Sequence, residues 1–278
     1  MRNVIKIWCL IIVTLASSVS FSQSFSPDNL NAPSTKKYLE FGLGMSDLHI
    51  RDNYINPRIY NPQGVQLNAG LSVENRDYQQ YITAMYSGQN FGWGYNAPDA
   101  AQYQVELAYS ILFTAFNGNL LGKPFRLGIG PGLSTYFSTT DVFTSSSIDW
   151  FGVSDKTWYV QNSLDFHALA TIQTNRTDEL SFGLTCSAIH FSTRPDPGHN
   201  FSSHNNQVRN NFFHAYTNER VNYFPKNMNT SWQAAYSKQF SEKLQITGQV
   251  SFSYYSDDQP VQLKMYRVSY LIHFQFSI

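Results

Sequence analysis

Two residues that could carry hydrolytic chemistry, His190 and Ser192, stand two positions apart in the stretch FGLTCSAIHFSTRP, residues 182–195. Side chains at positions i and i+2 of a strand point to the same side, so an extended chain brings the imidazole and the hydroxyl together. A serine beside a histidine can act as nucleophile with the histidine as base, and an acid then orients the ring. Glu219 or Asp196 could supply that acid, so this pair is a candidate for acyl ester hydrolysis.

The segments that must position this pair alternate apolar and polar residues. In GVQLNAGLSVE (64–74) the apolar residues fall on every second position, and the same holds for 102–114, where Leu112 is the one apolar residue out of phase. The closing run places Val268, Tyr270, Ile272, Phe274, Phe276 and Ile278 on one face and Arg267, Ser269, His273, Gln275 and Ser277 on the other. A period of two residues predicts strands with one apolar and one polar face.

Ten strands are expected from this alternation, with eight to twelve possible. Their predicted ranges are 36–48, 63–75, 78–87, 101–116, 124–138, 157–173, 179–192, 228–240, 243–255 and 262–278. Long connections (49–62, 88–100, 139–156 and 193–227) alternate with short turns near 75–77, 117–119, 175–178 and 241–242. Long connections thus fall at one end of the strands and short turns at the other. This arrangement favours an all-β fold, a transmembrane antiparallel β-barrel with long extracellular loops and short periplasmic turns.

Composition agrees with such a barrel. Charged residues make up 14% and aromatic residues 16% of the 278 residues, and the mean hydropathy of −0.32 is too polar for a bundle of membrane helices. Removing Arg2 and Lys6 with the leader leaves 17 basic against 19 acidic residues, so the mature chain is slightly acidic and nucleic acid is not an expected partner.

The first 22 residues have the pattern of a cleaved secretory signal peptide. Arg2 and Lys6 precede an apolar run, and a small-x-small site ends at Ser22. Residues 23–35, rich in Ser, Asn and Pro, predict a periplasmic lead-in, and 36–278 form the barrel domain. After cleavage Cys186 is the one remaining cysteine, so an internal disulfide is excluded.

As a pattern the mature chain resembles the small outer-membrane β-barrels of Gram-negative bacteria, which also end on an alternating strand with aromatic residues. The resemblance implies a location in the outer membrane, contact with its lipids and possible contact with lipopolysaccharide. Trp93, Trp150, Trp158 and Trp232 all map near the long-loop end, as an interfacial aromatic belt requires.

Around His190 the stretch 164–198 is similar to the region of lipid A deacylases that carries a His-x-Ser signature. That resemblance implies His190 as base and Ser192 as nucleophile, although the family follows the serine with Asn where this chain has Thr193. If even positions of strand 179–192 face lipid, as Phe182 and Leu184 suggest, both residues lie on the outside of the barrel near its outer rim. The alternative is that the strand simply ends in the polar interface, where such residues cost little.

A second candidate lies in the lumen, where the alternation gathers seven titratable residues: Glu40, Glu74, Glu106, Arg126, Asp165, His167 and Arg267. They predict either an ion path or proton-linked switch, or a structural polar network that fills a narrow barrel. No metal or cofactor motif is present, and His199, His204 and His214 lack metal-site spacing. Three functions therefore remain open: a structural or surface-recognition barrel whose extracellular ligand is unknown, an acyl ester hydrolase, and a narrow pore.

Overall fold

The computed structural model describes residues 35–52, 56–60, 63–91, 100–142, 156–193, 220–223, 228–257 and 263–278. Its strands are β1 (Lys36–Asp52), β2 (Asn56–Tyr60), β3 (Gln63–Glu74), β4 (Tyr78–Phe91), β5 (Ala100–Leu120), β6 (Lys123–Val142), β7 (Lys156–Gln173), β8 (Asp178–Thr193), β9 (Arg220–Tyr223), β10 (Met228–Ser241), β11 (Leu244–Asp257) and β12 (Leu263–Ser277). Within these residues no helix is long and apolar enough to cross a membrane.

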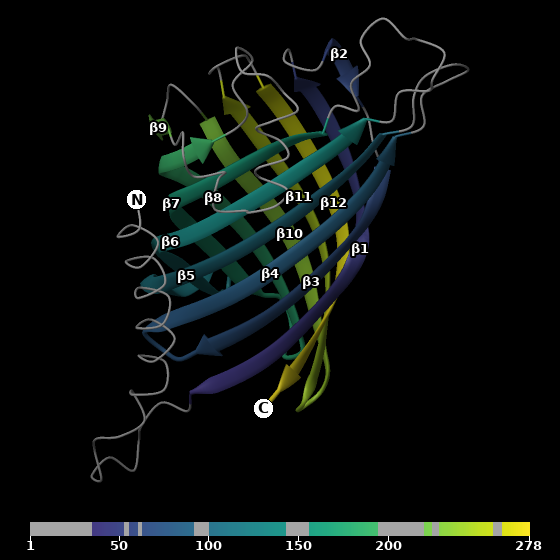
Figure 1. Cartoon of the computed structure of the whole chain (residues 1–278). Coiled ribbons are helices and arrows are strands. Elements are labelled where there is room, and N and C mark those ends of the chain that lie inside the picture. The colour runs from purple at the N-terminus through teal and green to yellow at the C-terminus, as the bar shows by residue number, and fades with distance from the viewer. Residues whose placement is uncertain are drawn as a thin grey trace, which may run out of the picture. The chain divides into compact units, whose positions relative to one another are not determined.

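Ten of these strands form a closed antiparallel barrel (Figure 1). Each pairs with its neighbour in sequence order, β8 pairs with β10, and β12 pairs with β1 to complete the ring. The predicted ten-stranded barrel is confirmed, and the strand ends differ from those expected by up to four residues. Two short strands, β2 and β9, were not expected: they pair with β1 and β8 inside segments predicted to be loops.

The two faces of the wall differ as the alternation predicts, with polar side chains inside and apolar side chains outside. On β1, Met45 is 60% exposed outside while Ser46 beside it is 1% exposed inside. Large apolar residues exposed on the exterior include Leu39, Phe41, Leu43, Val65, Leu67, Val105, Leu107, Phe182, Val250, Ile272 and Phe274. An apolar exterior on a closed barrel is stable when it contacts lipid, since closure leaves no strand edge unpaired.

The two ends of the barrel differ in their connections. At the short-turn end, residues 75–77, 121–122, 174–177 and 242–243 join neighbouring strands, and the barrel starts and ends there with Lys36 and Ile278. Leu121 and Gly122 have φ of 53° and 74°, the left-handed geometry of a tight hairpin. At the long-connection end the chain passes through 53–62, 92–99, 143–155, 194–227 and 258–262.

Glycines on the inner face make room for large side chains of neighbouring strands. A Cβ on Gly64 would lie 2.0 Å from the Gly88 carbonyl oxygen and 2.6 Å from Cγ of Gln89, whose amide donates a hydrogen bond of 2.9 Å to Ser46 Oγ. Leu112, the residue out of phase in the sequence, is buried inside the barrel, and a Cβ on Gly128 would lie 3.3 Å from its Cβ. The absence of a side chain at Gly64 and Gly128 therefore leaves space for Gln89 and Leu112.

Candidate functional site

A β-bulge in β8 determines where His190 and Ser192 point. Asp165 on β7 pairs with Ser187, but Leu164 pairs with Ile189, so Ala188 is an extra residue. Such an insertion reverses the facing of every later residue in the strand. Even positions face outward below the bulge and odd positions face outward above it.

His190 and Ser192 consequently point into the lumen, where they are 0% and 2% exposed. Their expected position on the lipid-facing exterior is wrong, because the alternation below Ala188 does not continue above it. They do lie on the same face of one strand, as expected from the spacing.

Ser192 is hydrogen-bonded to Asp257, which is neither of the two acids expected from the sequence. Its Oγ donates to Asp257 Oδ2 at 3.0 Å, and the Tyr255 hydroxyl donates to the same oxygen at 3.0 Å. The Tyr159 hydroxyl in turn donates to that of Tyr255. Asp257 extends the inward series 251, 253, 255 of β11 by one step, the signal that would have found it. Glu219 and Asp196, the expected acids, lie outside the described residues.

His190 does not contact Ser192 as a base contacts a nucleophile. Its ring lies beside that of Tyr255, with centroids 6.2 Å apart, and neither ring nitrogen has a hydrogen-bond partner among the described residues. The Ser192 hydroxyl proton is directed at Asp257 instead. Activation of a serine requires its hydrogen bond to reach the base, and among the described residues His190 and Ser192 are not joined in that way.

The hydrogen bonds from Ser192 lead into a second buried series along the inner face of β7. Tyr159 OH lies 3.1 Å from Gln161 Oε1, and Gln161 Nε2 donates to Ser163 Oγ at 3.3 Å. Ser163 and Ser134 hydroxyls are 2.7 Å apart. Asp165 ends the series by accepting hydrogen bonds from Ser134 at 2.7 Å and Ser187 at 2.6 Å. A buried carboxylate with two donors is compensated, which is the requirement of a structural network.

An apolar layer crosses the lumen at the level of the two tyrosines. The layer comprises Leu48, Ile50, Tyr159, Tyr255, Leu263 and Met265, with Tyr136 packed against it. These residues come from β1, β7, β11 and β12, with Tyr136 from β6. In the ring, β3, β4, β5 and β6 separate β1 from β7 on one side, and β8, β10, β11 and β12 separate them on the other. Side chains from opposite walls therefore meet near the long-connection end.

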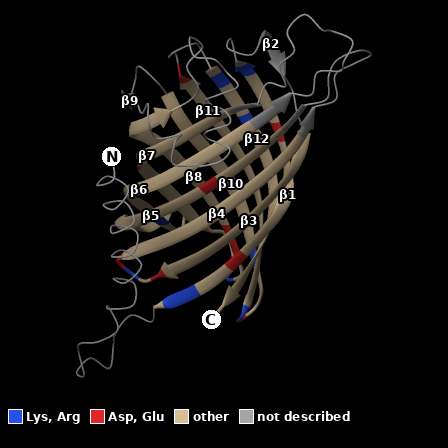
Figure 2. Ribbon diagram, in the orientation of Figure 1, with Lys and Arg blue, Asp and Glu red and all other residues tan. Residues whose placement is uncertain are grey.

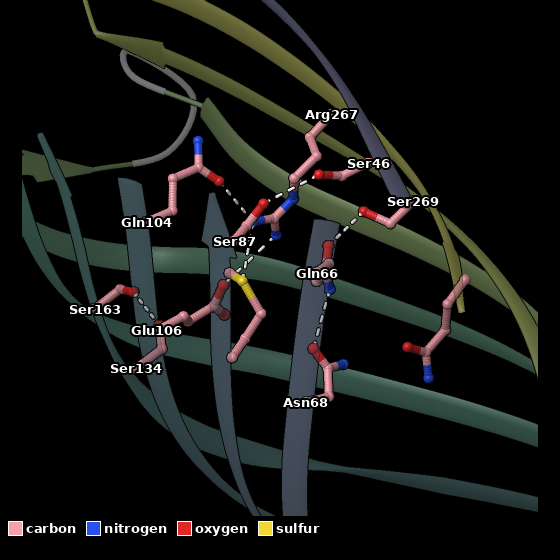
Figure 3. Close-up of polar contacts among 12 residues, drawn as sticks. Ser46, Gln66, Asn68, Ser87, Gln104, Glu106, Ser134, Ser163, Arg267 and Ser269 are labelled. Atoms are coloured by element: carbon pink, nitrogen blue, oxygen red, sulfur yellow. Dashed lines mark hydrogen bonds and ion pairs between the residues drawn. The ribbon is translucent and has the colours of Figure 1, made fainter. Parts of the chain in front are cut away.

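A charged contact also crosses the lumen (Figure 3). Arg267 on β12 lies 3.5 Å from Glu106 on β5, donates to Gln104 Oε1 at 3.2 Å and reaches the Met85 sulfur at 3.8 Å. Its side chain passes over β1, β3 and β4 to do so. The same view shows Ser269 donating to Gln66 at 2.8 Å. These contacts link strands that are not hydrogen-bonded to each other.

The other predicted lumen residues form separate groups. Arg126 binds Glu74 at 2.6 Å and also donates to the Thr114 hydroxyl and the Asn75 carbonyl. Glu40 lies 2.5 Å from His273 Nδ1.

His167 Nδ1 lies 3.0 Å from the Thr185 hydroxyl. The seven residues predicted for the lumen are thus on the inner face, but they are distributed over several groups instead of one continuous path. No cluster of His, Cys, Asp or Glu in the described ranges could hold a metal ion.

The tryptophans only partly define a belt. Trp232 is exposed on the outside of β10, and Trp158 near the long-connection end of β7 is buried with Val160 against Phe137. Trp93 and Trp150 lie outside the described residues, as do most of the loops 139–156 and 193–227.

No family model and no curated protein matches the chain. Among solved structures, the outer membrane protease OmpT of Escherichia coli is similar over 92% of this chain and 98% of its own, with 10% identity and a TM-score of 0.49. The attachment invasion locus protein Ail of Yersinia pestis matches over 87% and 99%, with 8% identity and a TM-score of 0.33. An outer membrane channel of Pseudomonas putida F1 matches over 92% and 100%, with 8% identity and a TM-score of 0.39.

Proposed function

We propose that this chain is an outer-membrane barrel with a closed lumen, whose role is structural or lies in surface recognition at the long-connection end. The observation that carries the proposal is the crossing of the lumen at two levels, by the layer around Tyr159 and Tyr255 and by the contact of Arg267 with Glu106. A barrel of ten strands is narrow, and side chains from opposite walls suffice to fill it. The outer rim is then the part left to meet a ligand.

The orientation follows from the unequal ends. In outer-membrane barrels the short turns face the periplasm and the long connections face the exterior. Residues 1–22 would direct export and be cleaved, residues 23–35 would lie in the periplasm, and lipids of the outer membrane would surround the wall. A test is an epitope inserted at residue 205 of the chain. Antibody should label intact cells, and labelling only after the outer membrane is permeabilised would contradict this orientation.

The purified barrel should produce no channel conductance in a planar lipid bilayer. Replacing both cross-lumen groups, as Arg267→Ala/Tyr255→Ala, removes contacts at two levels and should produce conductance steps, because water can then enter. The single variant Tyr270→Ala, on the outside of β12, is the matched control and should stay silent. Steps from the unaltered protein would show a pore and refute the closed lumen.

The alternative function, hydrolysis of acyl esters of lipid A, can be tested separately. Because Ser192 donates to Asp257 inside the barrel and the His190 ring nitrogens have no hydrogen-bond partner among the described residues, Ser192→Ala should leave the acylation of lipid A unchanged. Mass spectrometry of lipid A from outer membranes with the unaltered chain, with Ser192→Ala and with no chain should give identical spectra. Loss of an acyl group with the unaltered chain alone would establish the hydrolase and return Ser192 to the role of nucleophile.

A further inference from the structure

The lipid-facing side of β1 and β12 changes character toward the long-connection end. On β1, outward Leu43 and Met45 are followed by Asp47, His49 and Arg51. On β12 the outward apolar residues run from Phe276 up to Tyr266, and Lys264 is the next outward position. The outward apolar residues end at Met45 on β1 and four residues nearer the long connections, at Tyr266, on β12, since Met45 pairs with Tyr270 and His49 pairs with Tyr266. Beyond them a basic residue stands at the end of each strand, shown in blue in Figure 2.

Arg51 and Lys264 are direct partners across the two strands. Side chains at such positions start about 5 Å apart, and like charges directly opposite each other destabilise a sheet. Neither side chain has an ion pair or hydrogen bond with any residue in the described part of the chain. Asp47, the acid on this face, lies four residues below Arg51, about 13 Å along the strand. Among the residues that the structure describes, the pair thus has no anion beside it that would offset its repulsion.

The position of this pair is distinctive. Among the outward side chains described in the half of the barrel nearest the long connections, Arg51 and Lys264 are the sole Arg or Lys residues. Directly below them three aromatic rings lie together on β11 and β12. The Tyr254 and Tyr266 centroids are 5.0 Å apart, and those of Phe252 and Tyr266 are 6.4 Å apart. Amphipathic aromatic rings mark the level at which acyl chains meet headgroups.

We propose that Arg51 and Lys264, above Phe252, Tyr254 and Tyr266, bind the phosphate of an anionic lipid in the outer leaflet. The two cations supply charge-assisted donors to the phosphate oxygens, and Arg51 offers a planar fork for two of them. The aromatic rings contact the first part of the acyl chains. The inference rests on the proposed outer-membrane location, because only then do these residues lie at the headgroup level of that leaflet.

The test places the purified barrel in phosphatidylcholine nanodiscs that contain bisphosphorylated lipid A. Lipid retained after release into detergent is counted by native mass spectrometry. The unaltered protein should retain about tenfold more lipid A than Arg51→Gln/Lys264→Gln, since each basic residue near an anionic headgroup contributes modestly. The control Lys36→Gln/Lys243→Gln, which removes two exposed cations at the short-turn end, should retain as much as the unaltered protein.

Two further arms identify the chemistry that is recognised. Dephosphorylated lipid A should be retained weakly by all three proteins, and inorganic phosphate should not displace the phosphorylated lipid. Equal retention by the Arg51→Gln/Lys264→Gln variant, strong retention of the dephosphorylated lipid, or displacement by inorganic phosphate would each overturn the proposal. A protein that stays sensitive to protease in nanodiscs would instead refute the membrane barrel itself, so the two failures are distinguishable.

Discussion

Replacing Gly44 by alanine is expected to prevent closure of the barrel between its first and last strands. Gly44 on β1 is the partner of Leu271 on β12. A Cβ at this position would lie 1.9 Å from the Tyr270 carbonyl oxygen and 2.8 Å from Leu271 Cα, far inside van der Waals contact. Both are backbone atoms of the neighbouring strand, so no rotation of a side chain relieves the overlap. Without this pairing both strands would present unpaired edges to lipid, which is prohibitively costly.

Refolding into detergent micelles measures this effect. A folded barrel migrates faster than the unfolded chain on a gel run without boiling, and Gly44→Ala should remain mostly in the slow band. Gly248→Ala on β11 is the matched control, since a Cβ there meets no atom within 4 Å. It should fold fully and gain up to about 1 kcal/mol, because alanine loses less backbone entropy than glycine. Folding of Gly44→Ala equal to that of the control would show that β1 and β12 can separate without loss of the barrel.

Replacing Arg126 by methionine should lower the free energy of unfolding by about 2–3 kcal/mol. The guanidinium donates to Glu74, to the Thr114 hydroxyl and to the Asn75 carbonyl, so it ties β3 and its turn to β5 and β6. Removal leaves Glu74 inside the lumen with Gln79 as its remaining side-chain donor. The side chains of Arg126 and Glu74 are 18% and 36% exposed, so water compensates part of the loss.

Urea unfolding in detergent micelles, followed by tryptophan fluorescence, gives the comparison. Arg126→Lys keeps the charge but not the planar fork, so its midpoint should fall between those of Arg126→Met and the unaltered protein. Lys123→Met removes an exposed cation of the same strand, whose one side-chain hydrogen bond goes to the Thr174 carbonyl, and should change stability by less than about 1 kcal/mol. A midpoint for Arg126→Met equal to that of Lys123→Met would mean that the Arg126 contacts contribute little.

The strands could be predicted from the sequence because lipid on one side and polar side chains on the other impose a period of two residues. In β12 the predicted faces are the observed ones, from outward Val268 to Phe276 and from inward Arg267 to Gln275. The lengths of the connections distinguished the two ends of the barrel, with long connections at one end and short turns at the other. These properties are local along the chain, so no knowledge of contacts between distant strands was required.

The partners of the candidate residues could not be predicted in the same way. The alternation in β8 alone predicts His190 on the exterior. The extra residue Ala188 reverses this facing, and it can be recognised only from the pairing of β8 with β7. Asp257 reaches Ser192 only because β11 and β8 curve around one lumen. Arg267 and Glu106 were each expected inside, but their contact across the barrel depends on ring closure and on the curvature of the wall.

The bulge at Ala188 also changes which positions of β8 tolerate apolar substitutions. Along most of the strand, an apolar substitution at an even position meets lipid and is harmless, whereas at His190 or Ser192 the same change enters a packed polar interior. Residues near Ile189 follow the opposite rule. Related chains that keep this inserted residue should therefore vary freely among apolar residues at even positions below it and at odd positions above it. The residue at which the variable positions change from even to odd would locate the bulge from aligned sequences alone.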